Sequence, residues 1–296
     1  MDESKGLAER FEEQRPRLRA VAYRMLGSLS EAEDAVQEAW LRLSGAAHDD
    51  VGDLRAWLTT VVARISLNML RSRKTRSEAH VPDPIVDRAG GASPEHVLLL
   101  ANTVGLALLV VLDTLTPAER VAFVLHDVFG MSFEEIAPIV ERTPDAARQL
   151  ASRARRRVQE RKATPDVDLE VQRSVVDAFL AASHDGDFHR LVAVLDPDVV
   201  LRADVAATAP GKSLEIRGAD QVARRAQVFS RLGLLKLPVL VNGVPGLVCL
   251  LDGKPFSVMG FTVRGGKVAE IDILSDPERL NQLDLPVDEN GFLAGV

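Results

Sequence analysis

Residues 131–159 contain two short helix patterns with a stop between them, and this stretch constrains the fold more than any other. Ser132 and Glu135 have the spacing of a capping box, in which each side chain satisfies a backbone N–H of the other residue. Thr143 is a second predicted N-cap, and Pro144 follows it at a first helical position, where a missing N–H costs nothing. A short apolar helix, a turn and a second helix together predict a helix-turn-helix.

The second of these helices combines a small apolar side with a basic outer surface. Ala147, Leu150 and Ala154 recur at the spacing of one helix face, which predicts that they pack inward. Among residues 142–162, eight are basic and two are acidic. A solvated charged helix would explain this composition as well, but the two caps and the small inner residues favour a helix that binds DNA.

Arginine and glutamine side chains on such a helix can read base edges, while other cations neutralise phosphates. We expect base contacts from Arg148, Gln149 and Arg153, and phosphate contacts from the remaining arginines. The full predicted set is Arg142, Thr143, Asp145, Ala146, Arg148, Gln149, Ser152, Arg153, Arg155 and Arg156.

The formal net charge of −7 is unevenly distributed along the chain. Residues 55–76 hold six basic residues and no acidic one, whereas residues 166–296 hold 19 acidic and 13 basic residues. Two basic helices on an otherwise acidic chain favour local contacts with anions. The single cysteine, Cys249, excludes an internal disulfide and a Cys-based metal cluster, and we expect neither a metal nor a cofactor.

The longest apolar run, near residues 104–112, is far too short to cross a membrane. The first ten residues are polar and contain no signal-peptide core. These observations predict a cytoplasmic protein with no membrane contact.

The N-terminal part of the chain predicts two all-α domains. Residues 1–76 contain three amphipathic helix patterns, with Gly27 ending the first and Ser30 with Glu33 capping the second, and they suit a compact bundle. Residues 77–94 are rich in proline and read as a linker. Residues 95–162 form the second domain, which ends in the helix-turn-helix.

The C-terminal part changes in character. Helix patterns at residues 169–184 and 188–195 precede short β-rich runs that are separated by Asn-Gly, Asp-Gly and Gly-Gly turns. Residues 167–285 therefore predict an α+β domain in which an antiparallel meander curves over helices and encloses an apolar cavity, with residues 286–296 as a tail. The expected fold class is multidomain: two all-α domains followed by an α+β domain.

The order of these domains resembles bacterial sigma factors of the extracytoplasmic-function group, which is group IV. The matching residues are DAVQEAWLR at residues 34–42, the basic helix at residues 55–71, and LTPAER with the helix-turn-helix at residues 115–156. The third domain resembles the SnoaL-like cone of the sigma factor J type. It carries that type's motifs at residues 81–84 (VPDP), 242–246 (NGVPG) and 276–280 (DPERL).

This resemblance implies a sigma factor that binds core RNA polymerase and directs initiation at specific promoters, with a SnoaL-like domain that modulates it. Implied partners are the clamp helices of the polymerase largest subunit, the flap region and promoter DNA. Residues 77–94 would link sigma region 2 (1–76) to sigma region 4 (95–162). The implied polymerase-binding residues are Asp34, Gln37, Glu38, Leu41 and Arg42.

The resemblance also places contacts to the promoter −10 element and an interdomain regulatory contact. Melted DNA would be held by His48, Asp53, Trp57, Arg64, Arg71, Arg73 and Lys74. The regulatory contact would involve Pro82, Asp83, Pro84, Asp276, Pro277, Glu278, Arg279 and Leu280. The chain departs from the usual pattern at Arg64, where the group carries Asn, at Asn68, where it carries Asp, and in the loop at residues 208–212.

Two other classes of function fit parts of the sequence. A helix-turn-helix repressor that binds duplex DNA as a dimer would explain residues 131–159 but not the two N-terminal motifs. A SnoaL-like cyclase or isomerase fused to a DNA-binding module would need a carboxylate or histidine in its cone. The candidates there are His184, His189, Asp204 and Asp272. The residues form no catalytic motif, so a regulatory domain is favoured over an enzyme, with room for a small ligand of unidentified class.

Overall fold

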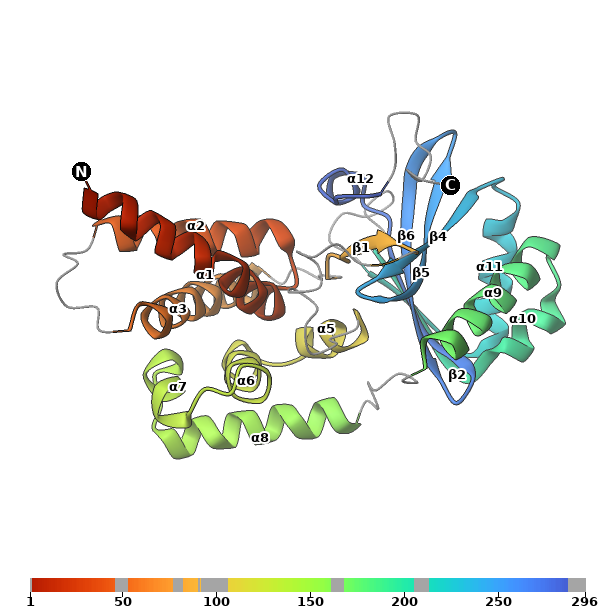
Figure 1. Ribbon diagram of the computed structural model, residues 1–296. Helices are drawn as coiled ribbons and strands as arrows, with labels where there is room; N and C mark the ends of the chain where they lie inside the picture. Colours follow the sequence, from red (N-terminus) through yellow and green to blue (C-terminus); the bar gives the residue numbers. More distant parts are fainter. Residues whose placement is uncertain are drawn as a thin grey trace. The chain divides into compact units, whose positions relative to one another are not determined.

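The computed structural model describes residues 2–45, 53–76, 82–89, 91, 106–160, 168–204 and 213–286. It divides into two compact units, which we call the helical unit and the sheet unit (Figure 1). The helical unit comprises residues 1–78, 97–102 and 109–163, and the sheet unit comprises residues 79–96, 103–108 and 164–296. The predicted fold class, helical domains followed by a domain of mixed sheet and helices, is confirmed.

Local backbone signals mark where the first three helices of the helical unit begin and end. They are α1 (Asp2–Leu26), α2 (Leu29–Gly45) and α3 (Leu54–Arg76). Gly27, at φ 70°, ends α1 as predicted, and its N–H donates to the Tyr23 carbonyl over 2.7 Å. The cap of α2 was predicted at Ser30, which is wrong: the helix begins one residue before it, and the Ser28 hydroxyl accepts the Glu31 N–H at 3.4 Å.

The second group of helices contains the helix-turn-helix. Its members are α5 (Leu106–Asp113), α6 (Pro117–Phe123), the π-helical turn η2 (Val124–Val128), α7 (Phe133–Val140) and α8 (Pro144–Glu160). The predicted capping box is confirmed, because the Glu135 N–H donates to the Ser132 hydroxyl and the Ser132 N–H donates to the Glu135 carboxylate. The Thr143 hydroxyl accepts the Ala146 N–H at 3.3 Å, which caps α8.

Charged side chains join these two helical groups, and two of them, Arg73 and Arg120, are buried. We call Glu31, Arg73, Asp113 and Arg120 the charged bridge. Arg73 pairs with Glu31 and lies 3.9 Å from Asp113, and Arg120 pairs with the same Asp113 at 2.7 Å. Burial lowers the pKa of Arg120, while the Asp113 carboxylate opposes that shift. The two groups predicted as separate domains therefore share one compact unit.

The sheet unit contains a seven-stranded sheet in the order β1-β4-β5-β6-β7-β2-β3. The strands are β1 (Val86–Arg88), β2 (Leu195–Asp204), β3 (Ser213–Arg217), β4 (Leu235–Val241), β5 (Val244–Leu251), β6 (Lys254–Arg264) and β7 (Lys267–Leu274). Strands β4 to β7 form the predicted antiparallel meander, but β2 pairs parallel to β7, which the prediction of an antiparallel meander did not include.

The three turns of the meander have the backbone that their sequences predict. Both central residues have positive φ at Asn242-Gly243 (52° and 78°), Asp252-Gly253 (50° and 75°) and Gly265-Gly266 (56° and 71°). Two-residue hairpin loops with positive φ at both positions match the twist of the flanking strands. These dipeptides therefore fix the register of the meander.

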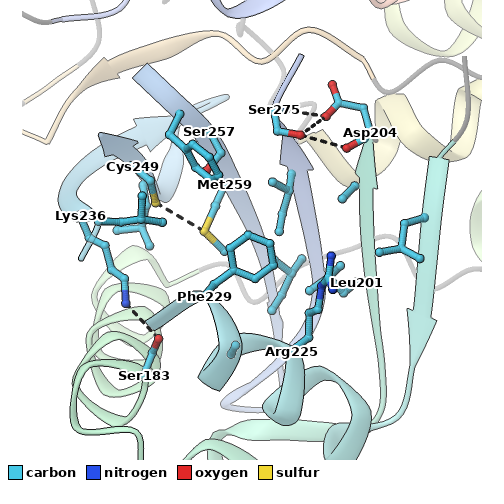
Figure 2. A pocket seen from close by; sticks show the side chains of 18 of the residues that line it. Ser183, Leu201, Asp204, Arg225, Phe229, Lys236, Cys249, Ser257, Met259 and Ser275 are labelled. Carbon is cyan, nitrogen blue, oxygen red and sulfur yellow. Dashed lines mark hydrogen bonds between the residues drawn. The ribbon is translucent and has the colours of Figure 1, made fainter. Parts of the chain in front are cut away.

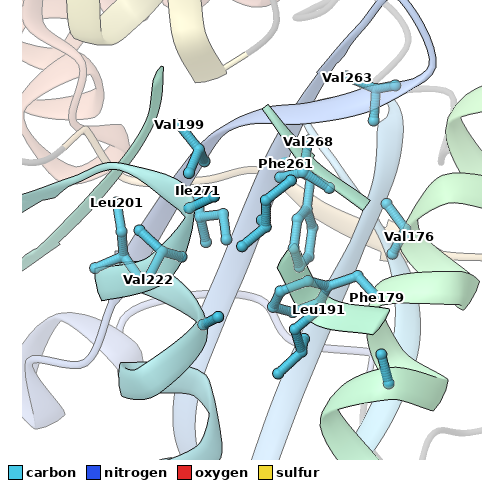
Figure 3. Close-up of a cluster of buried hydrophobic side chains, with 14 of the residues drawn as sticks. Val176, Phe179, Leu191, Val199, Leu201, Val222, Phe261, Val263, Val268 and Ile271 are labelled. Carbon is cyan, nitrogen blue, oxygen red and sulfur yellow. The ribbon is translucent and has the colours of Figure 1, made fainter. Parts of the chain in front are cut away.

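Helices cover one face of the sheet and form the core with it (Figure 3). They are α9 (Leu169–Asp185), α10 (Phe188–Val194) and α11 (Ala219–Ser230), and a short helix α12 (Pro277–Leu280) follows β7. Phe179 of α9 meets Phe261 of β6 edge to face, with ring centroids 5.4 Å apart, and Leu191 and Val222 are fully buried beside them.

Candidate functional site

Helix α8 presents the basic surface that the sequence predicted. Ala147, Ala151 and Ala154 are fully buried against the rest of the helical unit, while Leu150 is half-buried and not central to the contact. All of the predicted DNA-reading residues are exposed except Ala146 and Arg155, which are half-buried. The small inner residues let α8 lie close to α6 and α7 while its long cations point outward.

Some of these cations already have partners inside the protein. Arg155 pairs with Asp127 at 2.6 Å, and Arg148 pairs with Asp145 at 2.7 Å. In the described part of the chain, Arg153 and Arg156 are exposed and have no carboxylate partner. These two arginines therefore have their charge available to an anion, whereas a phosphate contact by Arg155 would require its ion pair to open.

The predicted −10 cations of α3 are divided between surface and interior. Arg64 and Arg71 are exposed, and both contact α7 or the residue after it: Arg64 donates to the Pro138 carbonyl at 3.4 Å, and Arg71 pairs with Glu141 at 3.3 Å. Arg73 is 8% exposed and belongs to the charged bridge, so its predicted place on a DNA-binding surface is wrong for this structure.

The remaining −10 residues lie at the start and end of α3. Asp53 is exposed, and its carboxylate accepts the Ala56 N–H at 3.1 Å, which caps the helix. Trp57 is half-buried. His48 and the Lys74 side chain lie outside the described residues.

The predicted polymerase-binding residues share the open face of α2. Asp34, Gln37, Leu41 and Arg42 are exposed, and Leu41 is 57% exposed although it is apolar. Glu38 is half-buried and pairs with Arg42 at 2.9 Å. An exposed leucine bordered by carboxylates and an amide is suited to a partner that offers an apolar groove with cations at its rim.

The linker is held by the sheet unit through contacts that we call the linker clasp. Strand β1, which belongs to the linker, extends the sheet next to β4, with Val86 opposite Val241 (Figure 1). The buried Asn242 side chain accepts the Ile85 N–H at 3.0 Å, and the Asn242 N–H donates to the Ile85 carbonyl at 2.7 Å. Asn242 was noticed in the sequence only as part of a turn, because its partner lies more than 150 residues away.

The clasp also contains an ion pair between the two motifs predicted to regulate the protein. Arg279 donates from Nε to the Asp83 carboxylate at 2.9 Å, and Asp83 is 7% exposed. Asp276 caps α12, which carries Arg279, by accepting the N–H groups of Glu278 and Arg279. Pro82 and Pro84 are buried, and Leu280 is 3% exposed.

A cavity of about 330 Å³ lies between the sheet and helices α9 and α11 (Figure 2). Asp204 lines it, but its carboxylate accepts the Ser275 N–H at 2.6 Å and the Asp276 N–H at 3.1 Å. His184 and His189 are exposed and take no part in the cavity wall. The sequence candidates for proton transfer therefore do not come together in the cavity.

Asp272 lies on β7 between Ile271 and Ile273, which line the cavity, so its side chain is on the opposite face of the sheet. There it pairs with Arg202 at 3.2 Å, and Arg202 also pairs with Glu270 at 2.8 Å. Burial raises the pKa of Asp272 to about 6, against the opposing effect of Arg202.

This raised pKa predicts a pH-dependent stability. The folded state binds a proton more readily than the unfolded chain between pH 3.8 and about 6, so the contribution of Asp272 decreases as the pH rises through this window. We expect the free energy of unfolding of wild type, relative to Asp272→Asn, to fall by about 2 kcal/mol from pH 4 to pH 7. Urea unfolding followed by the far-ultraviolet CD of the sheet unit would measure it. A pH-independent difference would contradict the prediction.

Among the described residues, no helix is long and apolar enough to cross a membrane, and no group of three His, Cys, Asp or Glu side chains could hold a metal ion.

Comparison with protein families first defines the class of the chain. Residues 10–76 match the model of sigma-70 region 2, and residues 105–158 match a model of sigma-70 region 4. The first range contains α3, and the second contains the helix-turn-helix. The regions that carry the exposed cations therefore match the regions of a sigma-70-type transcription factor.

Relatives that match nearly the whole chain identify the family within this class. The chain is 37% identical over 287 residues to the ECF RNA polymerase sigma factor SigJ of Mycobacterium tuberculosis, with 91% of each protein covered. It is 35% identical over 269 residues to the probable ECF RNA polymerase sigma factor SigI of the same species, with 89% of this chain and 91% of SigI covered. The chain belongs to the ECF RNA polymerase sigma factors.

The fold agrees with a solved structure in the same family. The crystal structure of the M. tuberculosis extracytoplasmic function sigma factor SigJ matches with a TM-score of 0.75 and 34% identity, covering 94% of this chain and 99% of SigJ. The expected resemblance to the sigma factor J type is therefore confirmed, and the family is one of transcription factors and not of enzymes.

Proposed function

We propose that this chain binds core RNA polymerase, directs it to a specific set of promoters, and is controlled by its own sheet unit through the linker clasp. The observation that carries the proposal is that one helical unit holds two unlike exposed surfaces. One is the basic face of α8, and the other is the face of α2 around Leu41. A repressor that binds duplex DNA has a use for the first surface alone.

The α2 face would dock on the clamp helices of the largest polymerase subunit, and the region around α6 to α8 would contact the flap. Because both contacts would be made with the polymerase, we expect the protein in the cytoplasm. Leu41 would supply apolar burial, and the neighbouring carboxylates would pair with cations at the rim.

The two DNA elements would be read by different helices. Helix α8 would enter the major groove at the −35 element, with Arg148, Gln149 and Arg153 at base edges and Arg142 and Arg156 at phosphates. Helix α3 would act at the −10 element, where a base must leave the stack and the exposed strand needs cations such as Arg64 and Arg71. The loop that contains His48 would hold the flipped base.

The contacts between α3 and α7 support the interpretation that this structure is a resting form. Arg71 of α3 and Glu141, the residue after α7, lie 3.3 Å apart, although α3 and the helix-turn-helix would read different elements. The two elements are centred about 25 base pairs apart, which is roughly 85 Å of duplex. The two helical groups must therefore separate before both elements are bound, and the clasp would oppose this by occupying part of the linker.

The proposal is tested by in vitro transcription of fragmented host DNA with core polymerase, comparing the full chain with residues 1–165. Specific starts from either protein establish a sigma factor, and more starts from the shorter protein establish inhibition by the sheet unit. Duplex binding without any specific start from either protein would favour the repressor.

Replacing Asp34 or Leu41 with alanine should reduce specific transcription by about tenfold or more, because residues at the centre of an interface dominate its affinity. Binding of α8 to a duplex −35 site should not change, since the two surfaces are separate. Transcription titrated with core polymerase and electrophoretic mobility shift with duplex DNA measure the two effects. Glu13→Ala, an exposed carboxylate on α1, is the matched control. Equal loss in both assays would indicate misfolding.

Arg153→Ala and Arg156→Ala should weaken promoter binding in different ways. Loss of a base contact by Arg153 should cost about 1–3 kcal/mol and relax the preference for one base pair. Loss of a phosphate contact by Arg156 should weaken all sequences alike and reduce the salt slope of binding by about one. Fluorescence anisotropy over a salt series, with a set of singly substituted −35 duplexes, distinguishes the two. Identical profiles for both variants would contradict these roles.

A further inference from the structure

The cavity of the sheet unit has a largely apolar wall, and two cationic side chains also line it. Its volume of about 330 Å³ falls at the lower end of the range for pockets that bind small molecules. Phe179, Leu247, Met259 and Ile271 form part of the wall. Phe229 also lines the cavity, and its ring lies near the middle of Figure 2. Such a surface favours an apolar ligand body.

Three charged side chains line the cavity: Asp204, Arg225 and Lys236. Asp204 is satisfied by backbone N–H groups and by Ser275, as described above. Figure 2 shows Lys236 beside Ser183 on one side of Phe229, Arg225 on the other side, and Asp204 with Ser275 away from Lys236. The cations are therefore not neutralised by this carboxylate.

Lys236 and Arg225 have neutral neighbours. The Lys236 ammonium donates to the Ser183 hydroxyl at 3.0 Å, and burial lowers its pKa. The Arg225 guanidinium lies 4.9 Å from the centroid of the Phe229 ring. Among the described residues, neither cation has a carboxylate partner. A half-buried cation without a counterion is unfavourable, and a bound anion would compensate it.

We propose that this cavity binds a small apolar carboxylic acid, with its carboxylate at the Lys236 ammonium beside the Ser183 hydroxyl and its apolar body against the sheet. The alternating apolar side chains of β5, β6 and β7 would bury the body of the ligand. The Lys236 ammonium would select the acid over a neutral molecule of the same shape.

The same cavity wall carries one side of the linker clasp. Pro277 and Leu280 of α12 line the cavity, and so does Asp204, whose carboxylate lies 3.9 Å from Arg279. An occupied cavity would press on α12 and on the residues that hold Arg279 against Asp83. This effect of the ligand on the linker clasp rests on the proposed control by the sheet unit, whereas binding of the ligand to the cavity does not.

The test uses the full chain without polymerase, and isothermal titration with octanoate, octanol and octylammonium. Octanoate is expected to bind about tenfold or more tightly than octanol, because a hydrogen bond to a charged group contributes at least about a tenfold gain in affinity. Octylammonium is expected not to bind. Lys236→Met should remove the preference for octanoate while octanol still binds, which also shows that the cavity has folded, whereas Arg225→Met, which changes the cation on the other side of Phe229, should retain the preference. Lys254→Met, at an exposed position of β6, is the control and should bind like wild type.

Equal binding of octanoate and octanol to wild type, or an unchanged preference in Lys236→Met, would overturn the proposal, as would no binding of any probe. A second measurement separates the cavity from the control of transcription. If octanoate binds but transcription by the full chain does not respond, the site stands and its coupling to the clasp fails.

Discussion

Replacing Arg279 with alanine should raise specific transcription by the full chain about fivefold or more. The substitution leaves Asp83 buried and without its guanidinium partner, a situation that costs about 3 kcal/mol or more and favours release of the linker. The predicted linker, residues 77–94, can span about 60 Å when extended. The clasp retains residues 82–89 of this length, so releasing it lets the two DNA-reading helices separate further.

The experiment combines transcription with hydrogen exchange. The Ile85 amide, which donates to Asn242, should lose protection in Arg279→Ala, and the double variant Asp83→Ala/Arg279→Ala should be no more active than either single variant. Arg231→Ala, an exposed arginine just after α11, is the matched control. Lost protection of Ile85 with unchanged transcription would refute control through the linker.

Replacing Asp113 with alanine should destabilise the helical unit by about 3–5 kcal/mol, because it removes the carboxylate that Arg120 and Arg73 share in the interior. Arg120 is 2% exposed and would be left with a buried charge. The chain has two tryptophans, Trp40 and Trp57, and both lie in the helical unit. Urea unfolding followed by their fluorescence therefore reports on this unit without interference from the sheet unit.

The control for this prediction is Asp145→Ala, which removes an exposed partner of Arg148 and should change the stability by less than about 1 kcal/mol. A shift of Asp113→Ala no larger than that of the control would show that the charged bridge contributes nothing.

The parts of the fold that depend on neighbouring residues could be predicted from the sequence. Ser132 with Glu135, Thr143 with Pro144, and the Asn242-Gly243 turn act over a few residues, and each is found where its motif predicts. The exposed face of α2 followed from helical spacing in the same way. Such signals also fix which cations of α8 point away from the core.

The parts that were missed depend on partners far along the chain. Strand β1 has three residues and no periodicity of its own, and it is ordered by pairing with β4 and by Asn242. Arg73 was interpreted as a surface cation because Glu31 and Asp113 are not near it in the sequence. The parallel pairing of β2 with β7 likewise has no local signal.

The pairing of β1 with β4 also bears on how the protein behaves in solution once it is switched on. In the sheet order, β4 has no neighbour other than β5 when β1 is absent, so release of the linker uncovers a row of backbone N–H and C=O groups. Strand β4 reads LKLPVLV, and Pro238 is its main defence against pairing with another chain. The active form should therefore self-associate more readily than the resting form, which would limit how long it persists without polymerase.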